Sequence, residues 1–214
     1  MLDFGFYNMD CMDGMKEFPD GFFDLAIVDP PYGINADKMT MGSGNHIFSK
    51  DKDWDQSIPD EAYFKELFRV SNNQIIWGGN YFTEYLHPSA NWIVWDKMNP
   101  NLSFAEGELA WMQFGDNLRI YSYYTVRAAK KDPKIHPTQK PISLYKWLLN
   151  RYMPEGGVLL DTHVGSASSL VACRELGFKY VGFEIDEDYF REAKKRLDAA
   201  EAQANIFDFI GGTT

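Results

Sequence analysis

The sequence predicts a three-layer α/β fold built around a mainly parallel sheet. Three observations support this expectation. Short apolar runs alternate with segments of helical periodicity, two of the runs end in an acidic residue followed by a turn, and no stretch approaches the ~20 apolar residues of a membrane span. Alternation favours parallel strands, because parallel neighbours need a crossover that is usually a helix. In such sheets ligands bind beyond the carboxyl ends of the strands.

The individual elements follow from the pattern in chain order. The expected strands are the apolar runs 23–28, 74–77, 92–95, 108–114, 158–160 and 180–183, with a further short run at 6–7. The expected helices cover 60–70, 141–152, 166–176 and 187–202. Pro141 suits the first turn of its helix, and Gly177 suits a helix stop after Leu176.

Length and composition indicate one domain over residues 1–214. The chain is 45% hydrophobic and 16% aromatic, which is ample for a core and unlike a disordered chain. Cys11 and Cys173 lie far apart within apolar patterns, so we expect reduced core residues and a cytoplasmic protein, with a disulfide as the less favoured alternative. The amino terminus lacks the basic start and apolar block of a signal peptide.

Charge is distributed unevenly along the chain. The net charge of -10 argues by itself against a nucleic-acid partner. Residues 119–151, however, hold eight basic residues and one acidic residue, a local charge of +7 that leaves −17 for the remainder. A basic segment on an acidic body suits a polyanionic partner on one face, and an ordinary solvated loop is the alternative.

The stretch "LAIVDPPYGI" at 25–34 is the first candidate site. Its apolar run reads as a buried strand, which must stop at Pro30 because adjacent prolines lack backbone N–H groups and have a fixed φ. The stop leaves Asp29 and Tyr32 on a rigid corner at the strand's carboxyl end. The segment 35–57 that follows is polar and contains glycine, and we expect it to act as a mobile flap over the site.

The stretch "LLDTHVGSASSL" at 159–170 is the second candidate site. A strand ends in Asp161, and the small residues after it allow a ligand to approach the backbone at the start of a helix. About twenty residues on, the next strand ends in Glu184, where dinucleotide folds hold a ribose diol. The combination favours a nucleoside-like cofactor over a purely structural turn.

Together, "DPPY", "HPTQKP" at 136–141, "DTHVGSASS" and "GFEID" resemble motifs of the amino-methyltransferases that act on exocyclic amines of DNA bases. The order, catalytic motif first, is similar to the permuted β group, and the small size resembles phage or prophage members. The resemblance covers nearly the whole chain. It implies a Rossmann-like methyltransferase fold, with a short target-recognition segment at about 115–135.

The cofactor motif departs from the family pattern D-P-F-x-G-S-G-T. Thr162 replaces proline, His163 replaces phenylalanine, Ala167 replaces the second glycine and Ser168 replaces threonine. We expect the turn to survive at Ala167 if φ is negative there. No paired His or Cys lies at ligand spacing from His163, so no metal site is expected.

The resemblance implies S-adenosylmethionine as the cofactor. Asp161 and Gly165 would approach its methionine part, and Glu184 its ribose hydroxyls. Asp10 would meet its adenine, with an ordinary loop aspartate as the alternative. The implied cofactor-binding residues are Asp10, Asp29, Thr138, Gln139, Lys140, Asp161, His163, Gly165, Ser166, Ser168 and Glu184, with Thr138, Gln139 and Lys140 at the carboxylate.

The implied reaction is methylation of an exocyclic amine. Asp29 and the Pro30 carbonyl would accept its two N–H bonds, and Tyr32 would stack on a base flipped out of double-stranded DNA. An aspartate before PPY usually accompanies N6-adenine, so N4-cytosine is the alternative; a nicotinamide-dependent oxidoreductase and a non-catalytic DNA-binding decoy are remote ones. The expected phosphate-binding residues are Arg119, Arg127, Lys130, Lys131 and Lys134.

Two further interactions stay open at this point. The tail "QANIF", Gln203 to Phe207, loosely resembles the pentapeptide that binds the bacterial sliding clamp. The favoured alternative is a terminal helix that packs Ile206 and Phe207 on the core. A homodimer and a role in restriction–modification, in a bacterial or phage-infected cell, are the other expectations.

Overall fold

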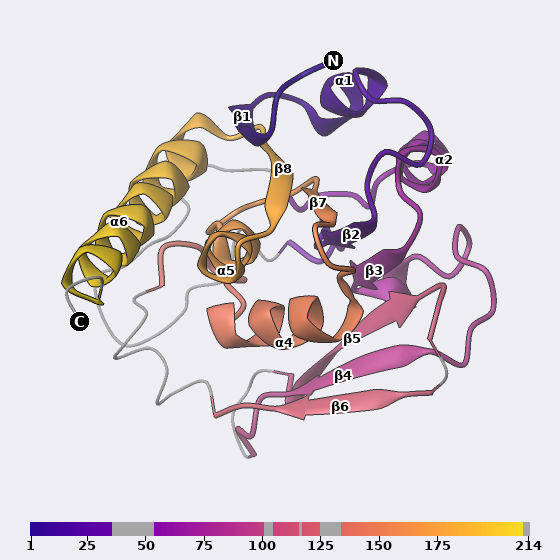
Figure 1. Cartoon of the computed structure of the whole chain (residues 1–214). Helices are drawn as coiled ribbons and strands as arrows, with labels where there is room; N and C mark the ends of the chain where they lie inside the picture. Colours follow the sequence, from indigo (N-terminus) through magenta and orange to yellow (C-terminus); the bar gives the residue numbers. More distant parts are fainter. Residues whose placement is uncertain (36–53, 101–104, 116, 125–133, 212–214) are drawn as a thin grey trace.

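The computed structural model describes residues 1–35, 54–100, 105–115, 117–124 and 134–211, with only the backbone described for 203–211. Within these residues the chain forms an 8-stranded sheet of order β1-β8-β7-β2-β3-β5-β4-β6 (Figure 1). The strands are β1 (Gly5–Asn8), β2 (Leu25–Val28), β3 (Gln74–Trp77), β4 (Trp92–Asp96), β5 (Gly107–Met112), β6 (Arg119–Ser122), β7 (Val158–Asp161) and β8 (Lys179–Glu184).

Every strand of this described sheet except β5 runs in the same direction. The mainly parallel sheet confirms the fold class predicted from the alternating pattern. β5 lies antiparallel between β3 and β4, so its first residues meet the last residues of its neighbours: Glu108 pairs with Trp95, and Ala110 with Trp77. The reversed strand therefore brings its own start to the edge where the parallel strands end.

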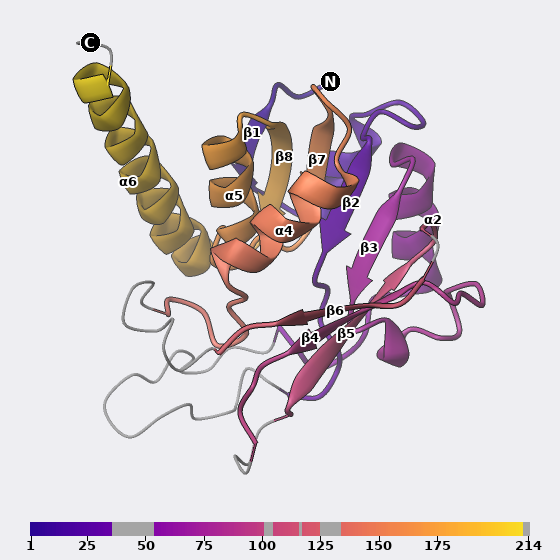
Figure 2. The same cartoon turned by 60° about the horizontal axis from the view of Figure 1, so that its bottom comes forward.

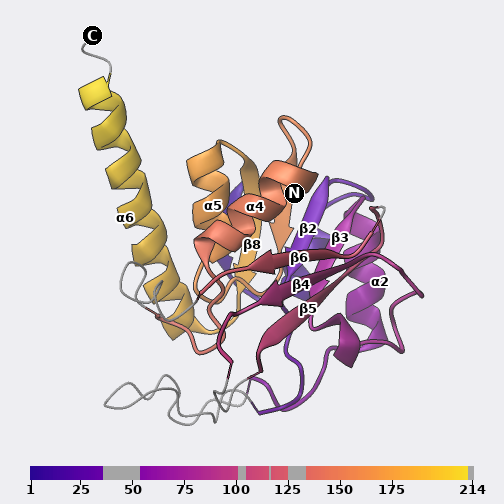
Figure 3. The same ribbon diagram turned by 90° about the horizontal axis from the view of Figure 1, so that it is seen from below.

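Helices cover both faces of the sheet and make the three layers. On one face lie α1 (Cys11–Lys16) and α2 (Glu61–Val70), and on the other α4 (Ile142–Tyr152) and α5 (Ser168–Leu176). Figure 2 shows α4 and α5 in front of the central strands and α2 on the far side. The long helix α6 (Glu187–Gly211) packs on α5, and its carboxyl end projects away from the sheet (Figure 3).

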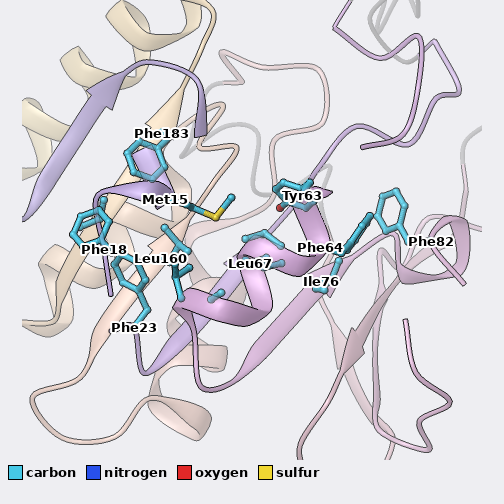
Figure 4. Close-up of a cluster of buried hydrophobic side chains, with 14 of the residues drawn as sticks. Met15, Phe18, Phe23, Tyr63, Phe64, Leu67, Ile76, Phe82, Leu160 and Phe183 are labelled. Carbon is cyan, nitrogen blue, oxygen red and sulfur yellow. The ribbon is translucent and has the colours of Figure 1, made fainter. Parts of the chain in front are cut away.

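The core divides according to the alternation of side chains along the buried strands. Ala26 and Val28 of β2 point to the α2 side, whereas Leu25 and Ile27 point to the α4 side. Figure 4 shows the first cluster, in which Phe64 and neighbouring side chains of α2 pack on the sheet. Each large apolar side chain buried in this way stabilises the fold by roughly 1.5–3 kcal/mol. The central strands therefore form a rigid support for the residues that follow their carboxyl ends.

Some elements differ from the sequence-based expectation. The short helix α1 was not expected; Asp10 caps it by accepting a hydrogen bond from the Met12 N–H at 2.7 Å. β6 lies inside the segment expected for target recognition, and its pattern is inverted, with Ile120 62% exposed while Tyr121 faces α4. The helix after 187 continues to Gly211 rather than ending near 202. Among the described residues, no helix is long and apolar enough to cross a membrane.

Candidate active site

The proline corner after β2 holds Asp29 where the strand stops, at the edge to which the arrowheads of β2 and β3 point in Figure 2. Its carboxylate has two close partners. Oδ1 accepts a hydrogen bond from Tyr32 Oη at 2.5 Å, and Oδ2 accepts one from Lys140 Nζ, also at 2.5 Å. Burial raises the pKa of Asp29, and the Lys140 ammonium opposes that shift.

Lys140 sits in a row of alternating charges. Its Nζ lies 3.0 Å from Glu108 Oε2, and Glu108 Oε1 lies 2.6 Å from Lys97 Nζ. Lys140 is 2% exposed, and its ammonium stands 5.1 Å from the centre of the Trp77 ring. Against the effect of burial, the two ammonium groups lower the pKa of Glu108 to about 2, so Glu108 is an anion at neutral pH.

Tyr32 is held by its backbone as well as by its hydroxyl. Oδ1 of the buried Asp55 accepts hydrogen bonds from the N–H groups of Tyr32 at 2.7 Å and Gly33 at 2.8 Å. The Tyr32 ring stacks on Tyr81 with centroids 5.0 Å apart. It also lies so close to Gly78 that an added Cβ there would stand 2.1 Å from the ring. The corner is therefore fixed from several sides.

Glu184, at the end of β8, organises the turn after β7. Its Oε2 accepts a hydrogen bond from the Gly165 N–H at 2.9 Å, and its Oε1 accepts one from the Asp186 N–H at 2.9 Å. These two bonds fix the orientation of the Glu184 carboxylate against the turn. Asp161 lies behind this turn, where it accepts hydrogen bonds from the Ser169 hydroxyl and the His163 N–H.

Asp161 and His163 have strongly perturbed pKa values. Burial is the main cause that raises the pKa of Asp161 to about 7, and the charges of Asp29 and Glu184 add to it. Burial also lowers the pKa of His163 to about 4, so its imidazole is neutral at pH 7. The Thr162 hydroxyl links His163 Nδ1 at 2.9 Å to the Tyr63 hydroxyl at 2.7 Å.

Ala167 adopts a left-handed conformation, with φ 60°, as the residue before α5. The negative φ under which the turn was expected to survive is not found, and the turn forms with a positive φ instead. Gly165 also has a positive φ, 52°, and a Cβ added there would lie 3.6 Å from the His136 ring. The turn thus uses two left-handed residues, of which only one is glycine.

A cavity of about 230 Å³ lies beside these groups. It brings together most residues expected at the cofactor, from four separate parts of the sequence: Asp29, Thr138, Gln139, Lys140, His163, Gly165, Ser166, Ser168 and Glu184. Asp10 and Asp161 do not line it, since Asp10 caps α1 and Asp161 lies behind the turn. Pro30 is buried beside the cavity, and Pro31 lines it.

The basic residues expected at DNA are only partly described. Arg119 lies in β6, on the outer edge of the sheet. Lys134 is exposed, and partial loss of hydration together with the nearby Lys97 ammonium lowers its pKa. Arg127, Lys130 and Lys131 lie outside the described residues, as do residues 36–53 of the expected flap and the side chains of Gln203 to Phe207.

Sequence reasoning missed several residues of this site. Trp54, His136 and Tyr189 line the cavity, and their rings contact one another in turn at 5.3 Å and 4.3 Å. The Trp54 Nε1 is buried and has no hydrogen-bond partner among the described residues. Of the three, only His136 belonged to a recognised motif. Glu108 lies in a strand that was expected, but the pattern did not show that this strand is antiparallel and that Glu108 therefore lies at the site.

The sequence is similar to those of known DNA methyltransferases. A family model described as DNA methylase matches residues 112–195. Type II methyltransferase M.HpaI of Haemophilus parainfluenzae is 24% identical over 241 residues, which span 94% of this chain and 75% of that protein. Type II methyltransferase M2.LlaDCHI of Lactococcus lactis subsp. cremoris is 27% identical over 223 residues, 82% of each protein.

Solved structures share the fold at low sequence identity. The M1.HpyAVI–SAM complex superposes with a TM-score of 0.60 at 20% identity, covering 89% of this chain and 98% of that one. The cytosine-N4-specific PvuII DNA methyltransferase gives a TM-score of 0.57 at 13% identity, covering 92% and 90%. The α/β architecture described above is thus the one that these methyltransferases have.

Proposed function

We propose that this chain, which is similar in sequence and fold to DNA methyltransferases, transfers a methyl group from S-adenosylmethionine to the exocyclic N6 amine of adenine in double-stranded DNA. The observation that carries the proposal is Asp29, a carboxylate only 16% exposed and held on a corner of two prolines beside the cavity. N4-cytosine methylation uses the same geometry and is the alternative product.

The residues of the cavity fit S-adenosylmethionine, which supplies an electrophilic methyl group on a positively charged sulfonium. Burial is the main cause that raises the pKa of Asp161, the carboxylates of Asp29 and Glu184 add to it, and a cationic ligand nearby would favour the ionised form of Asp161. Glu184 lines the cavity, where its carboxylate is proposed to accept hydrogen bonds from the ribose hydroxyl groups. The other polar residues that would hold the cofactor are Thr138, Gln139, Ser166 and Ser168.

The acceptor is a weak nucleophile, since its lone pair is delocalised into the base ring. Asp29 and the Pro30 carbonyl accept hydrogen bonds from the two N–H groups of the exocyclic amine, and thereby direct its lone pair away from the base ring. Because the corner is rigid, this arrangement needs no reorganisation during transfer. Tyr32 offers a stacking surface, which offsets part of the few kcal/mol that flipping a base costs.

The described part of the basic segment supports DNA as the partner. Lys97 ends the charge row that reaches Asp29, and its ammonium is near enough to contribute to the lowered pKa of Lys134. Phosphate contacts there would orient the duplex toward the cavity. Arg119, in β6, is proposed as a further phosphate contact.

Labelled methyl transfer to unmodified genomic DNA, followed by digestion to nucleosides, tests the reaction. We expect 6-methyladenine; 4-methylcytosine as the only product would contradict the adenine assignment. Asp29→Ala should lower the transfer rate at least about 100-fold, because it removes an electrostatic contact to the reacting amine. Its cofactor affinity, measured by calorimetry, should stay near that of the wild type.

Asp13→Asn serves as the control, since Asp13 forms an exposed ion pair with Lys16 on α1. This variant should methylate at the wild-type rate. Normal turnover by Asp29→Ala would overturn the role proposed for the corner.

A further inference from the structure

Both carboxylate oxygens of Asp29 already accept a hydrogen bond in the structure. Tyr32 Oη donates to Oδ1, and Lys140 Nζ donates to Oδ2. The second bond is charge-assisted and shielded from water, with the Lys140 side chain 1% exposed and that of Asp29 16% exposed. A substrate amine that approaches Asp29 therefore competes with an ammonium for the same oxygen.

Lys140 has a second carboxylate within reach. Glu108 Oε2 lies 3.0 Å from Nζ, so the Lys140 ammonium is shared between Glu108 and Asp29. Glu108 comes from the start of β5, which reaches this edge only because β5 is antiparallel. Moving the ammonium toward Glu108 would keep it paired with an anion, whereas separating it from Asp29 without Glu108 would leave a buried charge uncompensated.

We propose that Glu108 is a positioning residue that takes over the Lys140 ammonium when the substrate amine reaches Asp29, so that Oδ2 becomes free to accept the amine N–H. The proposal rests on the proposed function and names one more residue needed for it. Lys97 balances Glu108 in the described structure, so the row Asp29, Lys140, Glu108 and Lys97 carries no net charge. The ammonium can move within this row while its total charge stays constant.

A purely structural ion pair is the simplest other role for Glu108. The Lys97 contact by itself would satisfy that role without any contact to Lys140. The two roles differ in their effect on Asp29. The ionisable groups near enough to interact with Asp29 are Lys140, Glu108, Tyr32, Tyr63, Asp161 and Tyr145. Among them Lys140 favours the Asp29 anion, and the Glu108 charge raises the pKa of Asp29.

Glu108→Gln tests the proposal through turnover. With a neutral amide at 108, Lys140 keeps Asp29 as its only anionic partner, and we expect kcat for methyl transfer to fall roughly 10- to 100-fold. The affinity for S-adenosylmethionine and the melting temperature should stay near wild-type values, and Glu108→Asp should recover part of kcat. The acid limb of the pH–rate profile should move to lower pH, because Asp29 loses an anionic neighbour.

Glu66→Gln is the matched control, since Glu66 is about as exposed as Glu108, 18% against 20%, and is paired with Arg69 on α2. It should leave both kcat and the acid limb unchanged. A loss of kcat in Glu108→Gln that only accompanies a fall in melting temperature, or an unchanged kcat, would overturn the proposal.

A second readout needs neither cofactor nor DNA. The ¹³C carboxyl resonance of Asp29, followed in the ligand-free protein, should titrate at lower pH in Glu108→Gln and at higher pH in Lys97→Met, which frees Glu108 to attract Lys140. Equal midpoints in the two variants would overturn the proposal. If the two variants show these shifts but the wild-type protein methylates no DNA, the proposed function is contradicted instead.

Discussion

At the scale of single residues, Ala167 combines a buried methyl group with a left-handed backbone. A left-handed conformation costs a non-glycine residue roughly 1–2 kcal/mol. Burying the methyl group contributes about 0.8 kcal/mol, and alanine loses less backbone entropy on folding than glycine, by roughly 0.5–1 kcal/mol. These contributions nearly cancel, which explains why a methyl group is tolerated in a turn that the family pattern builds with glycine.

We therefore expect Ala167→Gly to change the free energy of unfolding by less than about 1 kcal/mol. Ala167→Val should destabilise by at least about 2 kcal/mol, because a β-branched side chain is strained at positive φ and overfills a buried site. Urea unfolding of both variants beside the wild type measures the difference. A large loss of stability in Ala167→Gly would show that the methyl group contributes more packing than its area implies.

At the scale of elements, Asp55 connects the corner after β2 to the segment that leads into α2. Its side chain binds the N–H groups of Tyr32 and Gly33, while its backbone carbonyl accepts a hydrogen bond from the Asn35 N–H at 3.0 Å. Asp55 thus connects the chain on either side of residues 36–53. The orientation of Tyr32 depends on a residue more than twenty positions away.

Asp55→Ala should lower methyl transfer at least about tenfold, since two backbone donors at the corner lose their acceptor and the stacking ring is no longer held. Asp60→Ala is the comparison: Asp60 caps α2 by accepting from the Tyr63 N–H at 3.1 Å, and its loss costs about 1 kcal/mol of stability. Steady-state kinetics should separate the two. Similar kinetic losses in both variants would indicate general destabilisation instead.

At the scale of the whole molecule, three strands deliver carboxylates to one edge of the sheet: Asp29 from β2, Asp161 from β7 and Glu184 from β8. Burial is the main cause that raises the pKa of Asp161 to about 7, and the charges of Asp29 and Glu184 add to it. A site with surplus negative charge favours cations, and a bound sulfonium would stabilise the ionised form of Asp161.

Binding of S-adenosylmethionine near pH 7 should therefore release a fraction of a proton, because the pKa of Asp161 falls from about 7 when the cation binds. Affinity should weaken as the pH drops below 7, where protonated Asp161 must ionise first. His163, with a pKa of about 4, does not titrate in this range. Calorimetry in buffers of different ionisation enthalpy measures the release, and Asp161→Asn should abolish it; equal release in that variant would contradict the assignment.

Most of the fold could be predicted from the sequence because its elements have clear periodicity. Apolar runs such as Leu25 to Val28 are buried on both faces, and the helices around them show one apolar side. α1 and β6 escaped prediction for local reasons. The first is only 6 residues long, and the second exposes Ile120 while it turns Tyr121 inward. Neither short element has a pattern strong enough to stand out.

By itself, the sequence determined where chemistry resides: acids at the ends of buried strands, a proline corner and a glycine-containing turn. These are local properties, since a strand stops where backbone N–H groups run out and a turn forms where side chains are small. Only the tertiary structure decided which charges meet. Asp29 and Lys140 are separated by 111 residues in the sequence. Glu108 pairs with Lys140 because β5 is antiparallel, so its first residues lie at the edge where the parallel strands end. Such pairings depend on strand order and direction, which short-range patterns do not encode.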